Sequence, residues 1–125
     1  MARILLIDDD RELRWTLRLM LEEVGHEVLE AADGVAGVEL QSRMEPELII
    51  TDIIMPEKEG IETILDLRRR DPNARIIAIS GGGRLTPKDF LSAARRLGAR
   101  CTLKKPFRRE QLLEAIYTCL ASDAA

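Results

Sequence analysis

Short runs of apolar residues alternate with longer amphipathic segments along the chain. The apolar runs predict five strands, at Arg3–Ile7, Glu27–Glu30, Leu48–Thr51, Arg75–Ile79 and Arg100–Leu103. The first, third and fourth are nearly continuous in isoleucine and leucine, which is typical of strands buried on both faces of a parallel sheet. The second run is mixed in character and fits a strand at the edge of that sheet.

The segments between these runs have the periodicity of helices. In the first segment the apolar residues fall on one stripe: Leu13, Leu17, Met20, Leu21 and Val24. Similar stripes predict four more helices, within residues 35–44, 61–67, 90–97 and 112–120. Thr86 is a suitable N-cap for the fourth helix, because a proline and an acidic residue follow it in the first turn. The alternation predicts a three-layer α/β sandwich with right-handed crossovers.

The length and composition fit one globular domain. The chain has 125 residues, of which 46% are hydrophobic and 33% charged, and its net charge is −3. We expect residues 1–125 to form a single domain with no effector domain, because only a short tail follows the last predicted helix. The chain has no basic stripe interleaved with aromatic residues, which argues against direct binding of nucleic acid.

The sequence also predicts a cytoplasmic protein that does not contact a membrane. The first strand begins almost at the N-terminus, so no signal peptide is expected, and no apolar run is long enough to span a bilayer. The two cysteines, Cys101 and Cys119, are too few for a disulfide framework and are expected to be reduced thiols.

Charged residues stand where three of the predicted strands end. Asp8, Asp9 and Asp10 follow the first strand, Asp52 follows the third, and Lys105 follows the fifth. Ligands of open parallel sheets bind outside the carboxyl ends of the strands, so these groups are expected to share a cleft. Crowded carboxylates need a compensating cation, and a hard ion such as Mg²⁺ prefers oxygen ligands. Asp10 is the exception, because it is well placed to cap the first helix.

Four segments resemble the receiver domain of two-component response regulators: Leu5–Asp10, Leu48–Pro56, Ile76–Gly81 and Gly98–Phe107. Each motif alone is weak, but the four occur in order over essentially the whole chain. The resemblance implies a flavodoxin-like (βα)5 fold with a parallel five-stranded sheet of order 2-1-3-4-5.

The resemblance also implies roles for single residues. Asp52 matches the phosphoacceptor, Ser80 matches the hydroxyl residue of the site, and Lys105 matches the lysine that precedes a proline. A carboxylate can attack phosphorus in line, while a lysine and a hydroxyl group can hold phosphoryl oxygens. In this family the lysine–proline bond is usually cis, so the Lys105–Pro106 bond is expected to be cis.

The metal that the resemblance implies is Mg²⁺, or Mn²⁺ in its place. Asp8 and Asp9 match the acidic pair that holds the ion, and Asp52 is a third ligand. The backbone carbonyl of Ile54 matches the position that completes the ligand shell.

As a member of this family the chain would be a signalling switch and not a turnover enzyme. It would accept a phosphoryl group from the phosphohistidine of a sensor histidine kinase or a histidine phosphotransfer protein, and signal through altered binding of a downstream protein that the sequence does not identify. Trp15 and Leu19 fall on the side of the first helix opposite its apolar stripe. They form either a docking patch for the kinase or a packing surface for a neighbouring element, and the sequence leaves both open.

The chain departs from the family pattern in two places. Thr102 stands where many receivers have tyrosine or phenylalanine, so the usual inward turn of an aromatic ring cannot report phosphorylation here. Gly81–Gly83 predict a mobile loop beside the site. In addition, Ile54 and Gly82, each two residues beyond a site residue, have no polar side chain to orient a hydrolytic water. Self-dephosphorylation is therefore expected to be slow to moderate.

Other functions remain open at this stage. The chain could be a phosphorelay carrier, or a receiver cut from a longer protein. An aspartate-nucleophile phosphatase would use Asp8, since two aspartates follow the first strand in such enzymes. That reading is disfavoured because Arg11 and Glu12 follow the aspartates and no cap domain is present.

Overall fold

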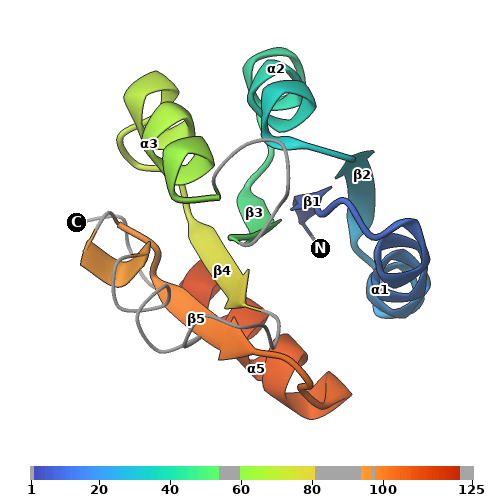
Figure 1. Cartoon of the computed structure of the whole chain (residues 1–125). Helices are drawn as coiled ribbons and strands as arrows, with labels where there is room; N and C mark the ends of the chain where they lie inside the picture. Colours follow the sequence, from blue (N-terminus) through green and yellow to red (C-terminus); the bar gives the residue numbers. More distant parts are fainter. Residues whose placement is uncertain (1, 54–59, 81–93, 97, 122–125) are drawn as a thin grey trace.

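The computed structural model describes residues 2–53, 60–80, 94–96 and 98–121. Its elements alternate along the chain (Figure 1): β1 Arg3–Ile7, α1 Arg11–Glu23, β2 Glu27–Ala31, α2 Gly34–Met44, β3 Leu48–Asp52, α3 Gly60–Arg70, β4 Ile76–Ser80, β5 Cys101–Lys104 and α5 Arg109–Ala121. Within this part of the chain, no helix is both long and apolar enough to cross a membrane.

The five strands form one parallel sheet in the order β2-β1-β3-β4-β5. This arrangement confirms the predicted flavodoxin-like (βα)5 fold. Four of the five predicted strands differ from the observed ones by one residue, β2 and β3 at one end and β4 and β5 at both ends. As a consequence, Asp52 and Ser80 are the last residues of β3 and β4, and do not follow them.

The sheet separates two apolar cores. Along β1, Ile4 and Leu6 belong to the core on the side of α1 and α5, while Leu5 and Ile7 belong to the core on the side of α2 and α3. Alternate side chains of a strand point to opposite faces, so a strand covered on both sides must be apolar throughout. Figure 1 shows the resulting three layers, with α2 and α3 on one face of the sheet and α1 and α5 on the other.

Two of the valines placed on the predicted helical stripes are exposed. Val24 is 41% exposed because it is the C-cap residue of α1, where the helical period no longer applies. Val35 is 64% exposed because the buried face of α2 runs instead through Gly34, Gly37 and Gln41.

Gly37 explains why this face of α2 is buried. A Cβ atom at this position would meet the side chain of Ile7 on β1, so the glycine lets the helix lie very close to the sheet. The apolar pattern of the sequence could not predict this face, because glycine carries no hydrophobic side chain.

The predicted helix that begins at Thr86 lies mostly outside the described residues. Residues 94–96 are helical, and Gly98 adopts a φ of 116°, a conformation that glycine tolerates at the end of a helix. The expectation for Gly81–Gly83 also lies outside the described residues.

Candidate functional site

Lys105 joins the carboxyl ends of β1 and β3. Its Nζ lies 3.0 Å from an oxygen of Asp52 and 3.4 Å from an oxygen of Asp8. Asp8 and Asp52 are only 4% and 5% exposed, and the lysine side chain is 24% exposed. The parallel topology thus brings together three groups that are 53 and 97 positions apart in the sequence.

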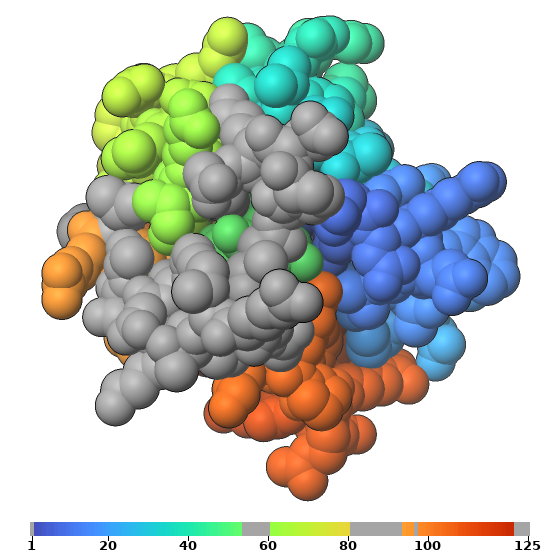
Figure 2. Space-filling model, in the orientation of Figure 1, coloured from blue at the N-terminus to red at the C-terminus, as the bar shows by residue number. Residues whose placement is uncertain are grey.

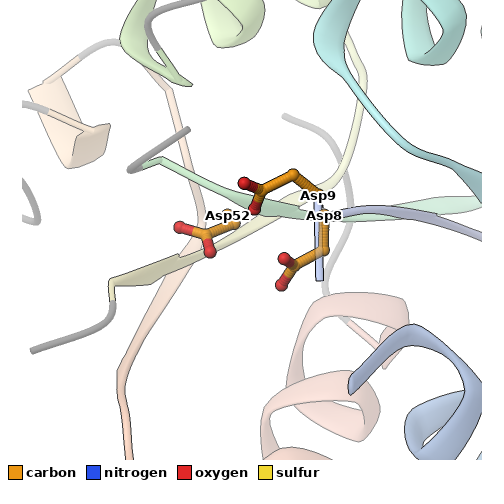
Figure 3. A group of neighbouring side chains, drawn as sticks. All are labelled: Asp8, Asp9 and Asp52. Carbon is orange, nitrogen blue, oxygen red and sulfur yellow. The ribbon is translucent and has the colours of Figure 1, made fainter. Parts of the chain in front are cut away.

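Three carboxylates surround a common space at this edge of the sheet. Asp8, Asp9 and Asp52 each offer an oxygen, and these oxygens lie within 4.8 Å of one another. Figure 3 shows Asp8 and Asp9 reaching this space from the end of β1, and Asp52 from the end of β3. Asp9 is exposed, so the group opens to solvent on its side. A donor set made only of carboxylate oxygens fits a hard cation such as Mg²⁺.

The carboxyl group of Asp8 is less acidic than an ordinary aspartate. Burial raises its pKa from 3.8 to about 6. The backbone N–H of Asp10, which donates to this carboxylate at 2.9 Å, acts in the opposite direction, whereas the nearby charge of Asp52 raises the pKa further. The ammonium group of Lys105 lowers it again. A divalent cation beside Asp8 would favour the charged form in the same way as Lys105 does.

Lys105 is held firmly in its charged form. Burial alone would lower its pKa, but the hydrogen bond and the charge of Asp52, with those of Asp8, outweigh this effect and raise the pKa above 10.5. The backbone N–H of Lys105 donates to the carbonyl of Ser80 at 2.8 Å, which fixes the lysine beside the end of β4. The Lys105–Pro106 bond is cis, as expected.

Local contacts hold the first acidic segment in place. Asp10 is the N-cap of α1 and accepts a hydrogen bond from the backbone N–H of Leu13, so its predicted capping role is confirmed. Arg14, one turn into the helix, donates to the backbone carbonyl of Asp8 at 2.6 Å and to Glu30 on β2 at 3.0 Å. Arg14 was not predictable as a neighbour of the site, because only the packing of α1 beside β2 brings it to Asp8.

The structure brings together most of the residues named from the sequence. Asp8, Asp9, Asp52 and Lys105 form one cluster, and Ser80 ends the strand next to β3, fully buried. The predicted carbonyl ligand Ile54 lies outside the described residues, as does Gly82.

Comparison with known proteins identifies the family. The model of the response regulator receiver domain matches residues 4–117. The chemotaxis protein CheY of Thermotoga maritima is 34% identical over 115 residues, which cover 91% of this chain and 93% of that protein. Protein PilH of Pseudomonas aeruginosa is 36% identical over 123 residues, which cover 97% of this chain and 99% of PilH.

Solved structures agree with this family assignment. The crystal structure of a response regulator receiver domain protein from Clostridium thermocellum matches with a TM-score of 0.89 and 28% identity. The match covers 96% of this chain and 94% of that one. Sequence, fold and the arrangement of the acidic residues therefore lead to one conclusion: the chain belongs to the receiver domain family of two-component response regulators.

Proposed function

We propose that this domain is a phosphorylation-dependent switch that accepts a phosphoryl group on Asp52. The observation that carries the proposal is the cluster in which Asp52 faces Lys105 at 3.0 Å and shares a common space with Asp8 and Asp9. Membership of the receiver family supports phosphorylation-dependent signalling in general. The donor would be a phosphohistidine of a sensor histidine kinase or of a histidine phosphotransfer protein.

Each side chain has a distinct task in the proposed transfer. An oxygen of Asp52 attacks phosphorus in line, the new bond joins this oxygen to phosphorus, and the bond from phosphorus to the donor imidazole breaks. Lys105, which is already charged and close to Asp52, stabilises a phosphoryl oxygen as a point charge. The Ser80 hydroxyl at the end of β4 would donate a hydrogen bond to a second phosphoryl oxygen.

Asp8, Asp9 and Asp52 would hold Mg²⁺, with the backbone carbonyl of Ile54 as a further proposed ligand. When bound, the ion supplies the positive charge that offsets the carboxylates and the phosphoryl oxygens. Asp8 is suited to this role because a buried carboxylate with a raised pKa gains strongly from a cation beside it. Asp9, being exposed, would complete the group from the solvent side.

The test is a labelling reaction with a small phosphodonor. The protein is incubated with acetyl phosphate and Mg²⁺, and the labile phosphate is mapped. We expect the label on Asp52, its loss in Asp52→Asn, and its loss when EDTA removes the metal. Label on Asp8, or turnover of the phosphodonor that persists in Asp52→Asn, would contradict the proposal and favour a phosphatase.

We further propose that α1 carries the docking surface for the phosphohistidine-bearing partner. Trp15 and Leu19 on α1 are 61% and 47% exposed, and this exposure supports the docking patch over the packing surface that the sequence also left open. Trp15 also lines a hollow of about 720 Å³ beside Arg14 and Glu30. Figure 2 shows the N-terminal segment, in blue, as one flank of the molecule, next to the orange-red segment of α5.

Docking and chemistry can be separated in the Trp15→Ala variant. This variant should keep the wild-type rate of labelling by acetyl phosphate, because Trp15 contributes nothing to the acidic cluster. Its rate of labelling by a phosphorylated histidine kinase or histidine phosphotransfer protein that labels the wild type should fall at least about tenfold, as expected for the loss of an exposed aromatic anchor. Equal rates for variant and wild type with the protein donor would contradict the docking proposal.

A further inference from the structure

Two thiol groups meet near the start of β5, at the opposite end of the strand from Lys105 and the acidic cluster. The Sγ atoms of Cys101, at the start of β5, and Cys119, near the end of α5, lie 3.3 Å apart. Cys119 donates to Cys101, and the Cys101 thiol in turn donates to the carbonyl of Ala115 at 3.9 Å. The hydrogen bonds described for the two thiols do not reach the acidic cluster, and the proposed function gives this pair no role.

The geometry suits a bond between the two sulfurs. A disulfide bond is about 2.05 Å long, so the sulfurs need to approach by little more than about 1 Å. Strand β5 and helix α5 contact one another and lie side by side in Figure 1, and both cysteines belong to the same apolar core. Side-chain rotation can therefore supply most of the approach while the backbone keeps its place.

The two thiols differ in their access to solvent. Cys119 is 1% exposed, whereas Cys101 is half-buried and lines an open hollow of about 410 Å³ together with Thr102 and Thr118. Burial, with the hydrogen bond to Cys101, raises the pKa of Cys119 to about 12, so this thiol stays protonated at neutral pH. A small oxidant therefore reaches Cys101 first, and Cys119 is the second thiol to react.

We propose that Cys101 and Cys119 form a redox-active dithiol that a hydroperoxide converts into an intramolecular disulfide. The Cys101 thiol loses its proton to solvent, the thiolate attacks a peroxide oxygen, and the O–O bond breaks. The departing hydroxide or alkoxide takes up a proton from solvent and leaves as water or alcohol. The sulfur of Cys119 then attacks the sulfenic acid on Cys101. The S–O bond breaks, and the departing hydroxide takes the Cys119 proton as water. The two thiols lose two electrons in total, and the peroxide gains them.

Closing this bond would tie β5 to α5. The two cysteines are 18 positions apart, and the segment between them contains Lys105. A cross-link of this kind restricts the unfolded chain and stabilises the fold. The oxidised protein should therefore melt at a higher temperature than the reduced one, by about 5–10 °C for a domain of this size.

The experiment compares the reduced and the peroxide-treated full chain. We expect the intact mass to fall by two hydrogen atoms, both thiols to become unreactive toward a thiol reagent after denaturation, and a peptide map to contain the 101–119 link. Dithiothreitol should reverse all three changes and the rise in melting temperature. Intact thiols after treatment, a link only between two chains, or oxygen added to one cysteine without a link would overturn the proposal.

Two variants make the order of reaction testable. In Cys101→Ser, the remaining Cys119 is buried and should resist both peroxide and iodoacetamide in the folded protein, with no rise in melting temperature. In Cys119→Ala, the sulfenic acid on Cys101 has no internal partner and should be captured by dimedone. Capture of a sulfenic acid on Cys119 in Cys101→Ser would contradict the assigned order and the accessibility argument behind it.

Discussion

The carboxyl group of Asp8 is charged at neutral pH although its burial disfavours the charged form. Its pKa is about 6 in the fold and 3.8 as an ordinary aspartate, so the folded state binds a proton more tightly than the unfolded state does. The stability that this preference provides is complete below pH 3.8 and is lost as the pH rises to about 6. Above that range, Asp8 destabilises the metal-free protein.

Asp8→Asn should therefore stabilise the metal-free protein at pH 7.5 by about 1–2 kcal/mol. The amide oxygen can still accept from the backbone N–H of Asp10, while the buried negative charge is removed. Urea unfolding in EDTA measures the effect, which should shrink between pH 6 and pH 4. Asp10→Asn is the matched control, because asparagine caps a helix as well as aspartate does. A loss of stability in Asp8→Asn at pH 7.5 would contradict this argument.

Arg14 acts on Asp8 through the backbone and not through the carboxylate. Its guanidinium group links the carbonyl of Asp8 to Glu30, so it fixes the segment from which two proposed metal ligands project. In Arg14→Met, half-maximal labelling of Asp52 by acetyl phosphate should need several-fold more Mg²⁺, while the rate at saturating Mg²⁺ stays near that of the wild type.

Arg18→Met is the control for this prediction. Arg18 also donates to Glu30, at 2.9 Å, but has no contact with Asp8 among the described hydrogen bonds. A simple loss of ion pairing around Glu30 would change the Mg²⁺ dependence of both variants equally. If Arg14 positions the segment that carries Asp8, only Arg14→Met, and not Arg18→Met, should change the Mg²⁺ dependence of labelling.

Among the secondary-structure elements, the strands were easier to predict than the helical faces. Every strand in the described residues lies within one residue of its predicted bounds. In β1, β3 and β4, continuous isoleucine and leucine leave few alternatives. The face of α2 was harder, since it is buried through Gly37 and Gln41 and not through Val35. Apolar periodicity records large side chains, whereas this face depends on the absence of one.

The acidic cluster and the pair of cysteines also differ in how well the sequence could predict them. The acidic cluster was predictable because its members stand at the ends of strands, and the parallel topology then fixes where those ends meet. The contact between Cys101 and Cys119 was not predictable, since the sequence suggested only two reduced thiols. It depends on how α5 is rotated against β5, which the spacing of two residues does not specify.

Gly37→Ala should destabilise the protein by about 1–2 kcal/mol, although alanine is the better helix former by about 1 kcal/mol. The added methyl group would meet the side chain of Ile7, which is 1% exposed and would have to shift within the core beneath α2. Chemical unfolding measures the change. Val35→Ala on the exposed side of the same helix should alter stability by less than about 0.5 kcal/mol. A Gly37→Ala protein as stable as the wild type would mean that α2 can shift away from the sheet at little cost.

For the molecule as a whole, Lys105 is the cation that connects the ends of β1, β3 and β5. Its ion pairs with Asp8 and Asp52 join the first strand to the last across the sheet. Removing the ammonium group leaves two buried carboxylates without this counter-charge, and an uncompensated buried charge costs far more than the pair contributes. Lys105 and a bound metal ion would therefore both neutralise the negative charges of Asp8 and Asp52.

Lys105→Met should lower the free energy of unfolding by about 1–3 kcal/mol at pH 7.5 in EDTA. Added Mg²⁺ should restore part of this loss, because the ion supplies positive charge to the same carboxylates. At pH 3, where Asp8 is protonated both folded and unfolded, the difference from the wild type should be smaller. Lys104→Met, the exposed neighbour at the end of β5, should change none of these values by more than about 0.5 kcal/mol. A deficit in Lys105→Met that neither Mg²⁺ nor low pH reduces would mean that the lysine stabilises the fold through packing of its aliphatic stem and not through its charge.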